Sequence, residues 1–181
     1  MAYSNYVEQT WQDLNASYPV SAARMVFIED GVFNAHFQPA ARVFHNAAQS
    51  LTSGAATILA FNSERFDQAG GAASTMHDTV TNTSRLTCRY AGIYSIVCNV
   101  EWVANTAGTR TLTLRLNNTT NIGVTSAQSP TSATFRQSVA TIYSLSVNDY
   151  VEVQATQDSG GPLSVNSTGN YSPEFMWVRV G

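Results

Sequence analysis

Lysine is absent from this chain of 181 residues, and only 12% of its residues are charged, about half of the usual fraction in soluble domains. The nine basic residues are therefore all arginines, and they form no basic run. The formal net charge is −3. Because nucleic-acid binding depends on clustered cations that neutralise phosphates, we expect no nucleic-acid partner.

Long apolar runs are lacking as well. No stretch of the sequence approaches the length of a membrane-spanning helix. Residues 1–6 are polar and do not have the basic start of a secretory signal peptide. We therefore expect neither insertion into a membrane nor secretion through a signal peptide.

Cysteine is scarce, with Cys88 and Cys98 as the two thiols of the chain. Two cysteines make no disulfide framework, and no Cys/His pairs have the spacing of a zinc site. Cys98 falls on the apolar side of an alternating segment, so we expect both thiols to be buried and reduced. The alternative is a disulfide, which requires that the two segments lie adjacent and aligned.

Patterns that indicate catalysis are missing. His36, His45 and His77 form no His-x-x-x-His or His-Glu-x-x-His motif, the acidic residues show no paired spacing, and no calcium loop occurs. Ser74, His77 and Asp78 supply the residue types of a hydrolase triad, but adjacency in sequence does not bring such side chains into the required geometry. We expect no enzymatic activity, no metal site and no cofactor.

Residues 1–38 are predicted to form an arm that contains one helix. Ser21 can cap its start, and Pro39 stops its continuation. An apolar stripe with spacings of three, four and three residues follows one side of this helix: Met25, Ile28, Val32 and Ala35. Such a stripe is typical of a helix that packs on copies of itself. The alternative is a surface helix that packs on its own domain.

The arm carries an ordered motif that extends beyond this stripe. Trp11 and Asp13 open it, and the further matching positions are Pro19, Val20, Ala22, Ile28, Glu29, Gly31 and Ala35. With Met25 and Val32 as substitutes for Leu and Ile, the segment resembles Trp-x-Asp followed by Pro-Val-x-Ala-x-x-Leu-x-x-Ile-Glu-x-Gly-Ile-x-x-Ala. That pattern is found near the N-terminus of bacteriophage tail, baseplate and fibre proteins. The spacer 14–18 departs from the Asp-Gly that usually precedes the proline. The resemblance implies a virion protein that docks or assembles through Trp11 and the apolar stripe.

Residues 39–181 change to a period of two, which is typical of strands with one buried face. In segment 93–104, for example, Tyr94, Ile96, Cys98, Val100 and Trp102 share one side. The predicted strands are 42–45, 57–63, 85–90, 93–104, 110–117, 120–126, 133–145, 150–156 and 173–180. Many short strands favour a sandwich or barrel. The last segment is apolar on both sides, so we expect it to be central or buried between subunits.

Four segments in this region resemble the TNF-like jelly roll, including the globular head of complement proteins. Residues 86–96 read Leu-Thr-Cys-Arg-Tyr-Ala-Gly-Ile-Tyr-Ser-Ile, and 58–62, 145–151 and 175–178 match further family elements in order. Leu86, Ile96 and Asn148 depart from two aromatic residues and a glycine of the family. The resemblance implies a mainly β, antiparallel jelly roll of about ten strands that forms a homotrimer.

These observations lead to one leading hypothesis and one alternative. The leading hypothesis is a non-enzymatic, trimeric bacteriophage virion protein that is assembled in the host cytoplasm. It would attach through its arm to a tail or baseplate protein, or to the major capsid protein as a head fibre or decoration protein. A glycan of the host surface is a further candidate partner. The alternative is a TNF-like receptor- or glycan-binding module outside a virion.

Overall fold

A computed structural model describes residues 25, 28, 29, 31, 32, 38–69, 75–128 and 132–181. The chain splits into two compact units, Met1–His36 and Phe37–Gly181. In the first unit, the residues that the structure describes are helical. Across the described ranges, no helix is long and apolar enough to cross a membrane.

The second unit is built from strands. Its described residues form β1 (Ala40–Phe44), β2 (Gln49–Leu51), β3 (Thr57–Ile58), β4 (Ser63–Gln68), β5 (Arg85–Thr87), β6 (Gly92–Trp102), β7 (Thr109–Leu116), β8 (Thr120–Gln128), β9 (Phe135–Leu145), β10 (Tyr150–Gln157), β11 (Leu163–Asn166) and β12 (Glu174–Arg179). The predicted mainly β class is confirmed. The sequence patterns did not predict β2, β4 and β11 as separate strands.

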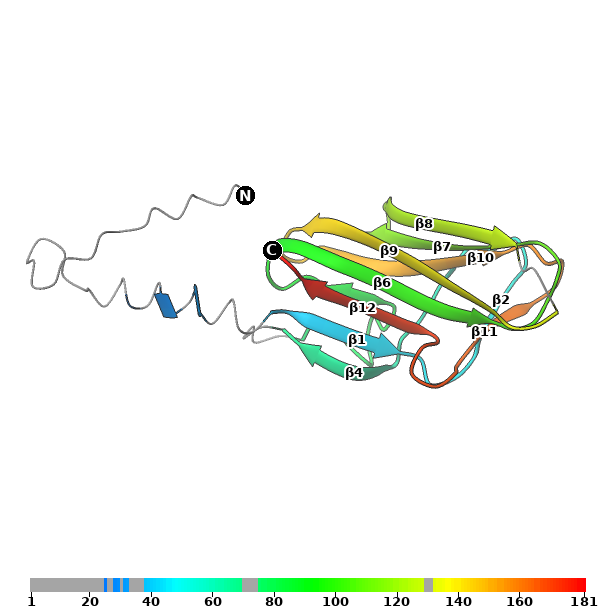
Figure 1. Ribbon diagram of the computed structural model, residues 1–181, viewed down its shortest axis with the longest axis horizontal. Helices are drawn as coiled ribbons and strands as arrows, with labels where there is room; N and C mark the ends of the chain where they lie inside the picture. Colours follow the sequence, from blue (N-terminus) through cyan, green and yellow to red (C-terminus); the bar gives the residue numbers. More distant parts are fainter. Residues whose placement is uncertain (1–24, 26–27, 30, 33–37, 70–74, 129–131) are drawn as a thin grey trace, which may run out of the picture. The chain divides into compact units, whose positions relative to one another are not determined.

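The strands form two antiparallel sheets that face each other (Figure 1). One has the order β2-β11-β6-β12-β1-β4, with β9 on the other edge of β6. The second has the order β3-β10-β7-β8, with β5 also on β10. Most neighbours in space are not neighbours in the chain, which gives the sandwich its jelly-roll connectivity. The last strand, β12, lies between β6 and β1, so its predicted central position is confirmed.

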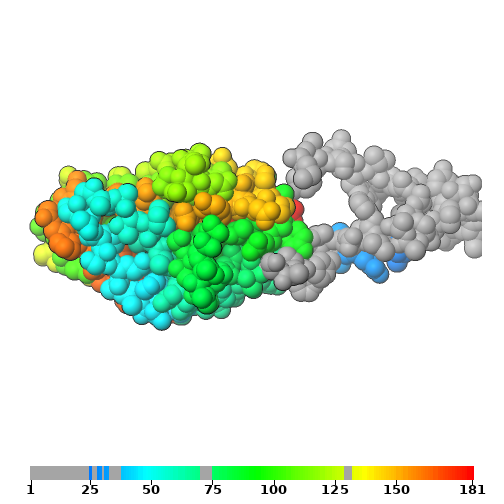
Figure 2. Space-filling view, turned by 180° about the vertical axis from the view of Figure 1, so that it is seen from behind, coloured from blue at the N-terminus to red at the C-terminus, as the bar shows by residue number. Residues whose placement is uncertain are grey.

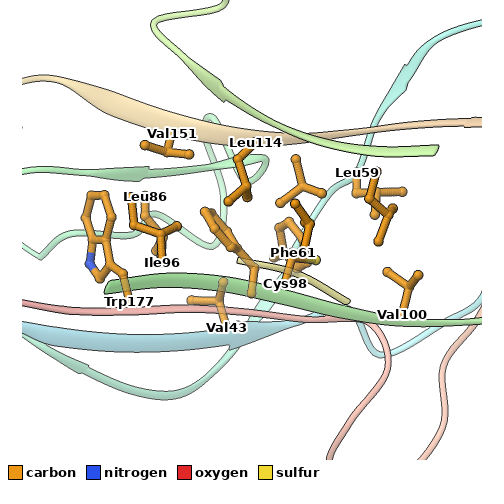
Figure 3. Packing of buried hydrophobic residues seen from close by; sticks show 14 of the residues in the cluster. Val43, Leu59, Phe61, Leu86, Ile96, Cys98, Val100, Leu114, Val151 and Trp177 are labelled. Atoms are coloured by element: carbon orange, nitrogen blue, oxygen red, sulfur yellow. The ribbon is translucent and has the colours of Figure 1, made fainter. Parts of the chain in front are cut away.

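The core lies between the inward faces of the two sheets (Figure 3). The predicted inward side of β6 is buried throughout, from Tyr94 to Trp102. Ile96 and Cys98 face residues of the opposite sheet such as Leu114 and Val151. The rings of Tyr94 and Trp177 pack with centroids 5.0 Å apart. Each large apolar side chain buried in this way stabilises the fold by about 1.5–3 kcal/mol.

The predicted single strand over 57–63 is wrong, because this segment crosses from one sheet to the other. β3 ends at Ile58 in the smaller sheet, and β4 begins at Ser63 in the larger one. Between them, Leu59 and Phe61 are fully buried. The crossing is fixed by Asn62, whose side chain accepts from the Asn46 amide at 3.1 Å and donates to the Asn46 side chain at 2.9 Å. In the sequence, the continuous apolar run over 57–63 therefore resembles a single strand. In the structure, its middle residues connect two strands of different sheets and fill the core.

Both cysteines are buried and free, as predicted. Cys98 belongs to the inward side of β6, and burial raises its thiol pKa well above the ordinary value. Cys88 donates from its Sγ to the Tyr90 carbonyl at 3.0 Å. Burial likewise raises the pKa of Cys88.

Candidate functional site

The helix residues singled out from the sequence lie in the first unit. Met25, Ile28 and Val32 are helical, with 44%, 45% and 65% of their surfaces exposed. Trp11 and Ala35 lie outside the described residues. The role of all five in anchoring or oligomerisation stays a prediction.

His77 and Asp78, which drew attention as part of a Ser-His-Asp pattern, bind different partners. The Asp78 carboxylate accepts the amides of Val80 and Thr81 at 2.8 and 2.9 Å, and these bonds, that of Thr81 foremost, lower its pKa to about 2. The His77 Nδ1 instead lies 3.0 Å from Glu64 Oε1. Ser74 is outside the described residues. Within the described ranges, no group of three or more His, Cys, Asp or Glu side chains could hold a metal ion.

The most unusual surface is the outward face of the larger sheet. Residues directly opposite in an antiparallel ladder share a face, so the register places six apolar side chains together on this side. They form what we call the apolar band: Ile93, Val97, Ala140, Ile142, Met176 and Val178. Ile142 is 69% exposed, and Ile93 and Val178 are also exposed. Figure 1 shows the strands that carry the band, β9, β6 and β12, side by side.

The outward face becomes polar beyond the band. Glu174, with 1% of its side chain exposed, binds Arg42 Nε through Oε2 at 2.8 Å and Arg65 Nη2 through Oε1 at 2.9 Å. The Arg65 guanidinium also lies 3.8 Å from the centre of the Phe44 ring. Arg42 and Arg65 donate further bonds to the carbonyls of Asn170 and Gly169. One buried carboxylate thus organises two strands and the loop that leads into β12.

A second carboxylate, that of Glu101, binds other residues of the same loop. Glu101 accepts bonds from Asn166 at 3.2 Å, Thr168 at 3.1 Å and Arg136 at 2.9 Å. Desolvation by burial raises the pKa of Glu101, but these hydrogen bonds together outweigh it and hold the pKa below its ordinary value. The Arg136 guanidinium lies 4.8 Å from the centre of the Tyr171 ring. This cluster gives the outward face a polar end.

A hollow of about 310 Å³ lies at this polar end. Asn99, Arg136, Ser138 and Tyr171 are among the residues that line it. Ser138 donates its hydroxyl to Asn99 Oδ1 at 2.7 Å, across the β6–β9 ladder. The hollow therefore combines one aromatic ring, one guanidinium that is already paired, an amide and a hydroxyl. Such groups suit a neutral polar ligand or the polar rim of an interface.

Sequence reasoning identified one strand of the apolar band, because it expected the last segment, apolar on both sides, to be central or buried between subunits. It did not identify the rest of the surface. The signal was present in β6, where Ile93 and Val97 interrupt the polar side that carries Ser95, Asn99 and Glu101. The ionic clusters left no such signal, because Arg42, Arg65 and Glu174 are far apart in the chain. They meet only through the order β12-β1-β4 in the sheet.

Comparison with known proteins identifies similarity at the level of the fold. No family model matches the sequence, and no curated protein matches it either. Among solved structures, Eiger TNF from S. frugiperda is 15% identical, with a TM-score of 0.53 over 80% of this chain and 93% of that one. Murine APRIL at pH 5.0 is 12% identical, with a TM-score of 0.57 over 79% of this chain and 99% of that one. At such identities the likeness shows the architecture alone: this chain has a TNF-like jelly-roll fold.

Proposed function

We propose that this chain is a non-enzymatic structural protein of a bacteriophage virion. In this proposal, three jelly-roll heads assemble into a homotrimer, and the N-terminal arm attaches the trimer to the particle. The observation that supports the proposed trimer is the apolar band on the outward face of the larger sheet, in a fold that is TNF-like. The phage assignment rests on the motif of the arm.

The apolar band supports a contact between copies of the same chain. The exposed apolar side chains of the band lie close together on the sheet, although Ser95 stands between Ile142 and Val178. Such a surface favours a contact with another chain, because covering it removes apolar area from water. The charges next to the band are already paired, Glu174 with Arg42 and Arg65, and Glu101 with Arg136. Among the described residues, an interface over this face would therefore cover charges that are already paired, which lowers the cost of burying them.

The arm supports attachment to another virion protein. Its described residues are helical, and its unit is compact by itself. Met25, Ile28 and Val32 are exposed in this unit and have the spacing of a packing stripe. The partner is a tail or baseplate protein in one version of the proposal, and the major capsid protein in the other.

Two measurements test the proposal at separate points. Light scattering of the purified chain should give about three times its mass of 19.6 kDa. The trimer would be overturned by a monomer mass at micromolar concentration together with the absence of three-fold symmetry on the particle. Immunogold labelling locates the protein on phage particles. Label at the tail supports the tail version and label at the head supports the capsid version, whereas particles without label would remove the virion role.

A second candidate function is a receptor- or glycan-binding module outside a virion. The hollow lined by Tyr171, Arg136, Asn99 and Ser138 favours it, because aromatic, amide and hydroxyl groups are suited to a sugar ring. Deletion of residues 1–38 tests whether the arm is the anchor, on which the virion candidate depends. Loss of the truncated chain from particles supports the anchored virion protein, whereas unchanged incorporation shows that the arm is not the anchor.

A further inference from the structure

A second, smaller hollow lies away from the apolar band. Its volume is about 170 Å³, and its polar lining comes from His77, Asp78, Asn82, Arg85, Thr87 and Arg89. Arg85 and Thr87 belong to β5, which pairs with β10 in the smaller sheet. Figure 2 shows the segment that contains this hollow, in green, at the molecular surface.

Two arginines of this hollow differ from those of the outward face. Arg42, Arg65 and Arg136 each bind a carboxylate, whereas within the described residues neither Arg85 nor Arg89 has a carboxylate within 4.0 Å. Glu152 lies opposite Arg85 in the ladder, but its Oε1 accepts the Ser84 hydroxyl at 2.7 Å. The charges of Arg85 and Arg89 are thus left for another anion.

Both guanidinium groups are nevertheless held in place. The Arg85 guanidinium lies 4.5 Å from the centre of the Tyr150 ring, a cation–π contact that positions the group while leaving its N–H donors available. Arg89 donates from Nε to the Thr75 carbonyl at 2.7 Å, which leaves its two terminal nitrogens to bind elsewhere. Groups positioned in this way lose little freedom when they bind a ligand.

The other charged groups around the hollow have partners of their own. Asp78 is the acid in the lining, and its oxygens are occupied by the Val80 and Thr81 amides and the Thr81 hydroxyl. His77 faces Glu64 with Nδ1 and the Thr83 carbonyl, at 3.3 Å, with Nε2. Asp78, Glu64 and Glu152 thus each bind a neighbouring residue, whereas Arg85 and Arg89 have no carboxylate within 4.0 Å among the described residues.

We propose that this hollow binds a phosphate group. Arg85 and Arg89 would donate charge-assisted hydrogen bonds to its oxygens, as guanidinium groups do with planar or tetrahedral oxyanions. Asn82 and Thr87 would offer neutral polar contacts, and a volume of about 170 Å³ accommodates a single phosphate group. The phosphate comes either from free inorganic phosphate or from a phosphodiester of a surface polymer. The site depends neither on the trimer nor on the virion role.

Calorimetry with the full chain at constant ionic strength tests the site, with inorganic phosphate as the first probe. The native protein should give a saturable isotherm, and Arg85→Gln with Arg89→Gln should weaken binding at least tenfold. The matched control is Arg115→Gln on β7, because it removes an arginine that contacts the Asn118 carbonyl outside the hollow. Absence of saturation in the native protein, or an equal loss in the control, would overturn the proposal.

A second measurement avoids dependence on the folding of the variants. Phenylglyoxal modifies accessible arginines, and mass mapping of the native protein reports each site. Phosphate should protect Arg85 and Arg89 and leave Arg115 unprotected, and modification that phosphate does not change would contradict the site. A glycerol phosphate oligomer then distinguishes the sources. Binding at least tenfold tighter per phosphate assigns a surface polymer, and equal affinity assigns free phosphate.

Discussion

Arg42 Nε and Glu174 Oε2 lie 2.8 Å apart across the β1–β12 ladder, although 132 residues separate them in the chain. Arg65 binds the other carboxylate oxygen, so one acid joins β1, β4 and β12. Because 1% of the Glu174 side chain is exposed, its charge is stabilised almost entirely by these two arginines. The pairing is therefore a point at which a small change in the sequence should have a large effect on the fold.

Replacing Glu174 with Gln should lower the free energy of unfolding by about 2 kcal/mol. This loss is smaller than the usual cost of breaking a buried ion pair, because both arginines keep about a third of their side-chain surface exposed. Urea unfolding followed by circular dichroism measures the change. Glu152→Gln is the control, since Glu152 makes one bond to Ser84 and forms no ion pair among the described residues. An equal loss in both variants would contradict the importance of the buried pair.

Changing Ile142 and Val178 of the apolar band to Asp should convert the proposed trimer into a monomer. Both side chains are exposed in the single chain, so the fold of each head should persist while the contact between copies is lost. Light scattering gives the mass, and thermal unfolding reports the fold. Val80→Asp is the control, at a valine that is 87% exposed and outside the band. A trimer that survives the double change would place the subunit contact elsewhere.

Replacing Ile28 and Val32 with Asp should abolish incorporation into particles and leave the melting of the jelly roll near normal. The two residues belong to the first compact unit, and the heads fold around a separate core. Western analysis of purified particles measures incorporation, with Glu29→Gln in the same helix as the control. If the double variant unfolds the whole protein, the helix belongs to the core of its own domain.

Cys88 and Cys98 should resist alkylation in the folded protein. Burial raises both thiol pKa values and excludes the reagent, so little thiolate is present at pH 8. Intact-mass measurement should show no adduct under native conditions and two adducts after unfolding in guanidinium. A mass two hydrogens lower, with no adduct in either state, would reveal a disulfide.

Asp78 should titrate with a midpoint of about 2, because the Thr81 and Val80 amides stabilise its carboxylate. Its pKa in the folded state is lower than the ordinary value of 3.8, so its contribution to stability is present above that pH and is lost as the pH falls toward 2. Carboxyl carbon shifts in NMR give the midpoint directly. The Asp78→Asn variant should lose less stability than the native chain on acidification between these values, and an ordinary midpoint would contradict the turn geometry.

The sequence predicted the parts of the fold in which one face of a strand is buried. β6, β7, β10 and β12 were found because several alternating apolar residues mark each of them. β2 and β11, of three and four residues, are too short for such a pattern. β4 reads Ser-Glu-Arg-Phe-Asp-Gln and is mostly exposed, so its polar composition resembled a loop. Short strands and edge strands form because they pair with neighbouring strands. A single sequence does not show which strands will be neighbours.

Departures from the family pattern were informative in a different way. Asn148 stands where the family has Gly, and the structure gives it a φ of 72°. Asparagine is among the few residues that tolerate this left-handed conformation, so the turn is retained without glycine. The larger hollow and the ionic clusters had no comparable signal, because each collects residues from segments that only the order of the strands brings together. The smaller hollow was not identified from the sequence either, although its lining comes from one continuous segment, residues 76–89.

The position of β1 determines how the head resists a pulling force. The chain enters the sheet at Pro39, whose carbonyl accepts the Arg179 amide at 2.9 Å, and β1 then runs between β12 and β4. Ladder hydrogen bonds lie perpendicular to the strands, so tension on Pro39 along β1 shears both ladders at once instead of opening them one bond at a time. A head tethered through its arm would thus bear tension on a strand that is paired along both edges.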